Sequence, residues 1–243
     1  QRMILNTPQR PLMMPAELLA CFAPDTPDEV MRAFNHGRPG AFGGRHNAVV
    51  RWGQTASQPA GTGDVGNPVV LTWSFVPVGT ILPNAVGEGD LPSELFAWLN
   101  TLYGSQANWL PVFQAIFDRW EALSGLDFVY EPNDDGAAFP GSPGELGVRG
   151  DIRISAKNID GNSGILAYNY YPNTGDMVIN SFDSFYNNLG GDSLRMRNVL
   201  AHEVGHGLGF AHVCPVQRNK LMEPFVATGY DGPRRPLQLR RCL

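Results

Sequence analysis

Three of the five histidines in this 243-residue chain fall within eleven residues, in the pattern H-E-x-x-H-x-x-G-x-x-H. His202 and His206 are four residues apart, so on an α-helix both imidazoles project from one face, one turn apart. Gly209 follows where the helix can end, because glycine readily adopts a left-handed conformation, and the chain can then return with His212. Three imidazole nitrogens about 2 Å from one ion form the ligand set of a catalytic zinc site. The pattern therefore requires a helix that ends in a sharp turn beside a metal ion.

The same segment contains a group suited to acid–base chemistry. Three neutral imidazoles leave a tetrahedral zinc ion with one open position for water, and zinc lowers the pKa of that water to about 7. Glu203 follows the first histidine and can accept the water's proton, then pass it to the leaving amine of a cleaved peptide bond. A lone H-E-x-x-H pattern also arises by chance on protein surfaces. The third histidine and Met222, ten residues beyond His212, make the metal site the preferred interpretation.

The first quarter of the chain differs in amino-acid composition from the rest. Residues 1–66 are rich in proline and glycine and are interpreted as an N-terminal extension or pro-like segment. Within them we expect a short helix at Pro27–Asn35 and a strand at Ala48–Trp52, and residues 53–68 are typical of a linker or long loop. From residue 67 on, the chain is expected to form one domain that ends in a short tail.

The remaining sequence alternates strand and helix patterns. An amphipathic segment between Trp109 and Leu123, which begins near Asn108, predicts one long helix, and Ser193–Leu208 predicts the helix of the histidines. Strands are predicted at Val69–Val76, Asp127–Tyr130, Asp151–Ser155, Gly164–Tyr171 and Met177–Ile179. This order favours an α+β or mixed α/β fold with a twisted sheet.

Charge and cysteine content narrow the class of protein. The net charge of −5 is spread without long blocks, so we expect no nucleic-acid partner. No apolar run approaches the roughly 18 residues of a membrane-spanning helix. The three cysteines permit one disulfide, for which Cys214 and Cys242 are the preferred pair with Cys21 left over, although three unpaired thiols fit the count equally well. Cysteine use weakly favours a secreted protein.

The zinc motif followed by a methionine resembles the metzincin clan of zinc proteases. The segment His206–His212, with the sequence HGLGFAH, and Pro224 two residues after Met222 resemble the matrixins, the matrix metalloproteinase-type catalytic domains, and their bacterial relatives. Upstream, the long helix and the segments Gly125–Phe128, DIRIS and Gly164–Tyr168 follow the matrixin order. The resemblance covers roughly residues 69–230. It implies a zincin-like α+β fold with a twisted, mainly parallel sheet, a long helix, an active-site helix and a methionine turn below the zinc.

The resemblance also assigns roles to individual residues. It implies one catalytic zinc with His202, His206 and His212 as ligands, Glu203 as the base and Met222 as an apolar floor beneath the metal. Leu166 and Ala167 would lie on the edge strand that pairs with an extended substrate backbone. Pro224 and Phe225, in the segment Glu223–Phe225, would form one wall of the pocket for the residue after the cleaved bond.

The other metal sites of matrixins match this sequence less well than the catalytic zinc site does. Matrixins usually carry a structural zinc, but the matching positions here are Tyr168 and Val178, so we expect none. Calcium, which matrixins also bind, has candidate ligands in Asp160, Asn180 and Asp183. Asn180 replaces the usual aspartate, and an interpretation of these three as turn residues is slightly preferred.

Both ends of the chain depart from the matrixin pattern. Cys21 lies between Ala20 and Phe22, a poor match to the Pro-Arg-Cys-Gly setting of the matrixin latency cysteine, so a zinc-blocking role is not expected. The C-terminal tail is too short and proline-rich for the final helix of matrixins.

The sequence predicts a secreted, monomeric zinc metalloendopeptidase that cleaves extended polypeptides. Two other hypotheses remain. One is a zinc-binding but catalytically inactive interaction module, against which the retention of Glu203 argues. The other is a zinc hydrolase that acts on an amide other than a peptide bond.

Overall fold

A computed structural model of the chain describes residues 18–35, 50–213 and 219–233. In chain order the elements are β1 (Leu18–Phe22), α1 (Asp28–Asn35), β2 (Val69–Phe75), β3 (Ile81–Leu82), β4 (Leu91–Pro92), α2 (Leu95–Tyr103), α3 (Gln106–Glu121), β5 (Leu126–Tyr130), β6 (Ile152–Lys157), β7 (Ile165–Tyr170), β8 (Met177–Asn180), the 3-10 helix η1 (Ser184–Asn187) and α4 (Gly190–Gly207). No helix in these ranges is long and apolar enough to cross a membrane.

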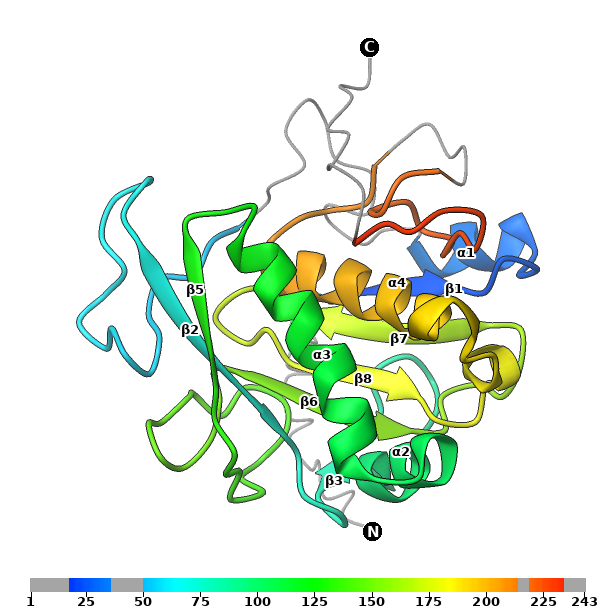
Figure 1. Cartoon of the computed structure of the whole chain (residues 1–243), viewed down its shortest axis with the longest axis horizontal. Coiled ribbons are helices and arrows are strands. Elements are labelled where there is room, and N and C mark those ends of the chain that lie inside the picture. The colour runs from blue at the N-terminus through cyan, green and yellow to red at the C-terminus, as the bar shows by residue number, and fades with distance from the viewer. Residues whose placement is uncertain (1–17, 36–49, 214–218, 234–243) are drawn as a thin grey trace, which may run out of the picture.

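A six-stranded sheet organises the molecule, with the strand order β1-β7-β8-β6-β2-β5. Strands β2, β5, β6 and β8 run parallel to one another, whereas β7 is antiparallel to β8, and β1 is antiparallel to β7. Helices α3 and α4 lie against one face of this sheet, and α4 runs along β7 and β1 (Figure 1). The α+β fold with a mainly parallel sheet is therefore confirmed.

The long helix α3 supplies much of the core. Its apolar residues at helical spacing are buried between the sheet and α4: Trp109, Phe113, Ile116, Phe117 and Trp120. Phe117 stacks on Trp73 of β2 with 4.3 Å between the ring centroids, which fixes the helix against the sheet. The helix begins at Gln106, two residues before the expected start.

Two expectations about local structure need correction. Residues 48 and 49 of the expected strand Ala48–Trp52 lie outside the described residues, and residues 50–52 form no strand. The indole Nε1 of Trp52 donates a 2.9 Å hydrogen bond to the carbonyl of Gly207, so this segment packs on the end of α4 instead of the sheet. Helix α2 was not predicted. The N-cap residue of α2, Glu94, makes no side-chain capping hydrogen bond, so the sequence lacks the usual signal for the start of a helix.

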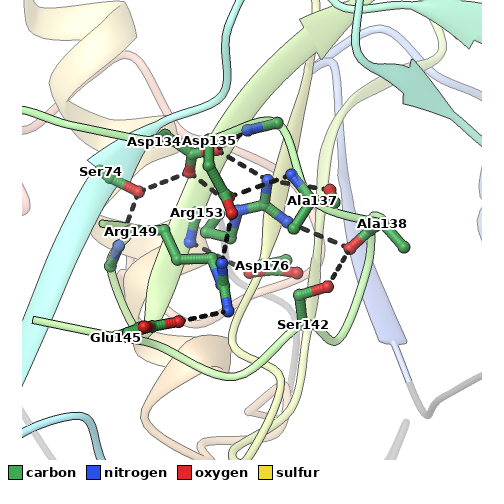
Figure 2. A network of polar contacts seen from close by, with 12 residues as sticks. Ser74, Asp134, Asp135, Ala137, Ala138, Ser142, Glu145, Arg149, Arg153 and Asp176 are labelled. Carbon is green, nitrogen blue, oxygen red and sulfur yellow. Dashed lines mark hydrogen bonds and ion pairs between the residues drawn. The ribbon is translucent and has the colours of Figure 1, made fainter.

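A buried guanidinium holds the loop before β6 against the sheet (Figure 2). Arg153 has no exposed surface, and its Nε and Nη2 donate 2.8 Å hydrogen bonds to the two carboxylate oxygens of Asp134. Its remaining donors reach the carbonyls of Ala137 and Ala138. A bidentate pair in which all three guanidinium nitrogens donate is the arrangement that makes a buried charge tolerable.

A second buried cation organises the segment between β3 and β4. The Nζ of Lys157 donates to the carbonyls of Leu82, Pro83 and Gly89 at 2.9–3.1 Å and lies 2.9 Å from the carboxylate of Glu88. Both charged side chains are almost fully buried. The ammonium thus occupies an oxygen-lined position of the kind that a metal ion fills elsewhere.

Candidate metal centre

Three imidazoles converge at the end of α4. His202 and His206 are one turn apart, with 2.8 Å between their Nε2 atoms, and the Nε2 of His212 lies 3.2 Å from that of His206. Two nitrogens about 2 Å from one tetrahedral ion are roughly 3.3 Å apart, so these spacings fit a shared cation. The three side chains are at most 1% exposed, and they form the one metal-ligating cluster of three that occurs within the described ranges.

Hydrogen bonds fix which nitrogen carries the proton in two of the three rings. The Nδ1 of His202 lies 2.6 Å from the carbonyl of Leu221, and that of His206 lies 2.6 Å from the carbonyl of Phe210. A carbonyl only accepts, so both rings must be protonated at Nδ1 and present lone pairs at Nε2. Two lone pairs 2.8 Å apart repel each other unless a cation lies beside them. The donor set therefore fits zinc.

Burial keeps these rings in the ligand form. Loss of solvation lowers the pKa of His202 to about 4. The same effect, together with the neighbouring imidazoles, lowers the pKa of His206 and of His212 well below the usual value. All three are therefore neutral at physiological pH, as metal coordination requires.

Two glycines allow the chain to bring the ligands together. Gly209 has a φ of 96°, and a Cβ there would overlap the carbonyl oxygen of Val50. Only glycine accepts both the left-handed conformation and this close approach, so the turn that delivers His212 depends on it. A Cβ at Gly205 would lie 2.5 Å from the Sδ of Met222, so glycine also makes room for that methionine beneath the helix. Met222 thus packs against α4 at Gly205, and its role as the floor beneath the metal stays a prediction.

Glu203 lies between the two helical histidines in sequence and is fully buried. Loss of solvation raises the pKa of its carboxyl to about 8. The thiol and the backbone N–H of Cys21 face this carboxyl and lower its pKa, yet neither forms a hydrogen bond of normal geometry with it. The carboxyl group next to the first ligand in sequence is therefore buried, and neither of its oxygens has a hydrogen-bond partner of normal geometry.

The residues expected to bind substrate lie on both sides of strand β1. Leu166 and Ala167 are in β7, and Pro224 and Phe225 are in the segment after Met222. Between them runs β1, which pairs antiparallel with β7 and also bonds the opposite segment, as the carbonyl of Pro224 accepts from the N–H of Phe22 at 2.9 Å. The sequence interpretation missed this strand, although its five apolar residues LLACF stand between Pro15 and Pro24.

The calcium candidates lie together beside the β6–β7 loop, with their polar atoms engaged by protein groups. The amide nitrogen of Asn180 donates to the Oδ1 of Asp160 at 3.1 Å, and to the carbonyls of Gly161 and Ile165 at 2.9 Å. Asp183 accepts from the N–H groups of Phe185 and Ser163. These are the bonds of turn residues, and calcium binding stays a prediction.

Other predicted positions have structural roles or fall outside the described residues. The hydroxyl of Tyr168 donates to Glu88 at 2.9 Å, and Val178 is buried in the sheet, so neither side chain is free for a metal. Absence of a structural zinc stays a prediction. Cys214, Cys242 and the last ten residues of the tail lie outside the described residues, whereas Cys21 is a buried free thiol.

Comparison with known proteins agrees with this geometry. Residues 100–234, more than half of the chain, match the family described as matrixin. The sequence is 32% identical over 138 residues to karilysin from Tannerella forsythia, an alignment that covers 54% of this chain and 26% of that protein. The chain thus spans about a quarter of the length of this curated relative. With the matched region containing the histidine cluster, Glu203 and Met222, the chain belongs to the matrixin family.

Proposed function

We propose that the protein is a zinc-dependent endopeptidase that cleaves extended polypeptides with Glu203 as general base. One observation supports this function above all. The Nε2 lone pairs of His202 and His206 converge with the ring of His212, and a buried carboxylate follows the first ligand in sequence. A site that bound metal only for stability would close its coordination with protein ligands and would not need that carboxylate.

Different side chains bind the metal and transfer the proton. Zinc, when bound, acidifies water and polarises a carbonyl group. His202, His206 and His212 hold the ion, and the carbonyls of Leu221 and Phe210 keep two of these rings in the correct tautomer. Glu203 accepts the proton of the attacking water and donates it to the nitrogen of the leaving amine.

Strand β7 and the segment of Pro224 and Phe225 are the proposed binding surfaces for the substrate backbone. The edge of β7 at Leu166 and Ala167, which β1 occupies, can add a substrate strand when β1 leaves it, and the segment with Pro224 and Phe225 borders that position on the other side. Backbone pairing of this kind requires an extended polypeptide and depends little on the sequence of that polypeptide. Side-chain preference would then arise from the wall near Phe225.

We also propose an organisation for the whole chain. Residues 67–243 form the catalytic domain, and residues 1–66 form an extension that reaches the active site through β1. The protein acts as a secreted monomer with one catalytic zinc. These proposals rest on the matrixin family and on the burial of β1 in the sheet.

The test combines zinc analysis with hydrolysis of an unfolded protein. Because β1 lies where substrate would bind, the assay uses both the wild type and Phe22→Asp, which places a carboxylate in a fully buried position and expels the strand. Glu203→Gln in each background should retain one zinc and lose about 10²–10⁴-fold in hydrolysis rate. Glu145→Gln, at an exposed carboxylate, is the control.

Two results would contradict the proposal. Hydrolysis that is unaffected by Glu203→Gln would remove the general base from the mechanism. One bound zinc without hydrolysis of any polypeptide in the Phe22→Asp background would favour the inactive interaction module.

A further inference from the structure

The segment before β2 packs on the end of the helix that carries the first two histidines. Helix α4 ends at Gly207, and the last carbonyl groups of a helix need partners from outside its own ladder. The carbonyl of His206 accepts from the N–H of Gly209 at 2.8 Å. The carbonyl of Gly207 accepts from the indole Nε1 of Trp52 at 2.9 Å. A side chain from a distant part of the sequence therefore completes the end of this helix.

The turn that follows α4 sets the position of two metal ligands. Residues 207–211 connect His206 to His212, and the carbonyl of Phe210 in this turn lies 2.6 Å from the Nδ1 of His206. Two of the five residues are glycines, which have more conformational freedom than any other residue. The turn therefore depends on contacts from outside to keep one conformation.

Trp52 is itself held in place by its surroundings. Its side chain is 6% exposed, and a Cβ at Gly175 in the β7–β8 turn would lie 2.5 Å from the Cζ2 of its ring. The carbonyl of Trp52 accepts from the hydroxyl of Thr62 at 2.7 Å, and the N–H of Gly53 donates to the Oδ1 of Asn173 at 2.7 Å. These contacts fix the indole against the β7–β8 turn, so it is a stationary donor for the end of α4.

The same segment contacts the second glycine of the turn. A Cβ at Gly209 would overlap the carbonyl oxygen of Val50, which precedes Trp52 by two residues. Trp52 thus contacts the turn at Gly207, and Val50 contacts it at Gly209. The two most adaptable positions between the second and third metal ligands are therefore both covered by this segment.

We infer that Trp52 is a positioning residue of the metal centre, whose indole N–H fixes the turn that sets His206 and His212 around one ion. This inference rests on the proposed zinc site and does not require hydrolysis. Trp52 is not a ligand and acts through the carbonyl of Gly207. Groups that orient metal ligands contribute about 10–100-fold to metal affinity, and Trp52, which acts one step further out, should contribute about tenfold. Residues 50–66 of the N-terminal extension thus support the metal centre.

Zinc affinity, measured on the full chain by competition with a chelator, tests this role. Trp52→Phe removes the N–H but keeps an aromatic ring, and it should bind zinc about tenfold more weakly than the wild type. Trp109→Phe is the matched control, because it loses an indole hydrogen bond of the same length, 2.9 Å to the Oδ1 of Asn100. This control should bind zinc as tightly as the wild type.

A spectroscopic measurement separates ligand geometry from general stability. Cobalt(II) in place of zinc gives visible absorption bands that depend on the arrangement of the ligands. These bands should shift or weaken in Trp52→Phe, because the turn between the ligands relaxes when the carbonyl of Gly207 loses its donor. They should be unchanged in Trp109→Phe, even where that variant loses thermal stability.

A second pair of variants covers the case in which Trp52→Phe does not fold. Thr62→Val keeps the shape of a buried side chain but removes the hydroxyl that holds the carbonyl of Trp52, and it should weaken zinc binding about two- to threefold. Thr101→Val is its control, since it loses a hydroxyl bond of similar length to the carbonyl of Ala97 on the surface of α2. Thr101→Val should leave zinc affinity unchanged.

The inference and the proposed zinc site fail in different ways. A wild type that binds no zinc refutes the site itself. Zinc bound equally tightly by the wild type and Trp52→Phe, or by Thr62→Val if the first variant does not fold, refutes the positioning role. Weakening of the same size in Trp109→Phe refutes it too, because the effect would then follow a general loss of stability. An unchanged cobalt spectrum in Trp52→Phe would show that ligand geometry does not depend on the indole.

Discussion

Asn180→Asp should convert a calcium-independent turn into one that needs a cation. The amide nitrogen of Asn180 donates to three oxygens, from Asp160, Gly161 and Ile165, at 2.9–3.1 Å. Its Oδ1 accepts from the N–H groups of Ile159 and Phe182, each at 3.2 Å, so the amide cannot be flipped. Aspartate would replace the donor with an oxygen that faces three other oxygens, and one of these belongs to a carboxylate.

The magnitude follows from the bonds that are lost. The two N–H groups, shared among three acceptors, contribute about 0.5–1.5 kcal/mol each, and with like charges brought together in a partly buried site the destabilisation is about 4 kcal/mol. A domain of this size loses roughly 2–4 °C in Tm per kcal/mol, so the expected fall is about 8–16 °C in a chelator. Calcium takes six to eight oxygen ligands at about 2.3–2.6 Å and should restore much of this stability to the variant.

Thermal unfolding in chelator and in calcium measures both effects, at a pH well above the usual pKa of a carboxyl group. Catalytic zinc must stay saturated or be absent in every sample. Asn158→Asp is the matched control, because its exposed side chain uses only its Oδ1, as an acceptor from Gly161, and aspartate keeps that role. An Asn180→Asp protein as stable as the wild type in chelator, or a wild type stabilised equally by calcium, would show that the amide does not stand in for a cation.

Three further predictions concern groups whose environment is well defined. Gly209→Ala should weaken zinc binding in a metal titration and lower stability by more than about 1–3 kcal/mol, because backbone strain at a positive φ adds to the overlap of the new Cβ with Val50. Gly66→Ala is the control for the backbone strain alone, because Gly66 has a φ of 97° and open space around it. Lys157→Met should cost about 3–5 kcal/mol in chemical denaturation by leaving Glu88 buried and unpaired, and the double variant with Glu88→Gln should recover part of it. Burial raises the pKa of Asp176 from 3.8 to about 7, so the unfolded chain loses this proton first and stability should fall, on the order of 4 kcal/mol, as pH rises from about 4 to about 7. The difference in unfolding free energy between wild type and Asp176→Asn should therefore shrink across that pH window, and a constant difference would contradict the raised pKa.

Local patterns were sufficient wherever neighbours in sequence determine the structure. The helix that carries His202 and His206 was expected from Ser193, and the regular part of α4 begins just after Ser193, since residues 191–193 have left-handed backbone angles. The strands β2, β5, β6, β7 and β8 all form within two residues of their predicted bounds. Helical spacing reports the buried side of a helix, and short apolar runs between turn residues mark strands such as β7 and β8, which are buried on both faces.

Strand β1 could not be placed from the sequence, although its apolar run could have been noticed. Its partners Tyr170 to Ile165 lie about 150 residues away, and no local signal specifies pairing over such a separation. The position of Cys21 beside Glu203 follows from that pairing and not from the residues around Cys21. The latency motif concerns the residues around a cysteine, whereas β1 is held by backbone bonds that depend little on side chains.

The way charge is balanced elsewhere in the fold strengthens the case for zinc at the histidines. Three oxygen clusters within the described residues are each satisfied by a protein donor, namely the guanidinium of Arg153, the ammonium of Lys157 and the amide of Asn180. No such donor stands between His202 and His206, where two rings protonated at Nδ1 turn lone pairs toward each other at 2.8 Å. A fold that neutralises its other clusters internally but leaves these lone pairs opposed favours an external cation there, since no pair of neutral tautomers can satisfy both Nε2 atoms while both Nδ1 bonds persist.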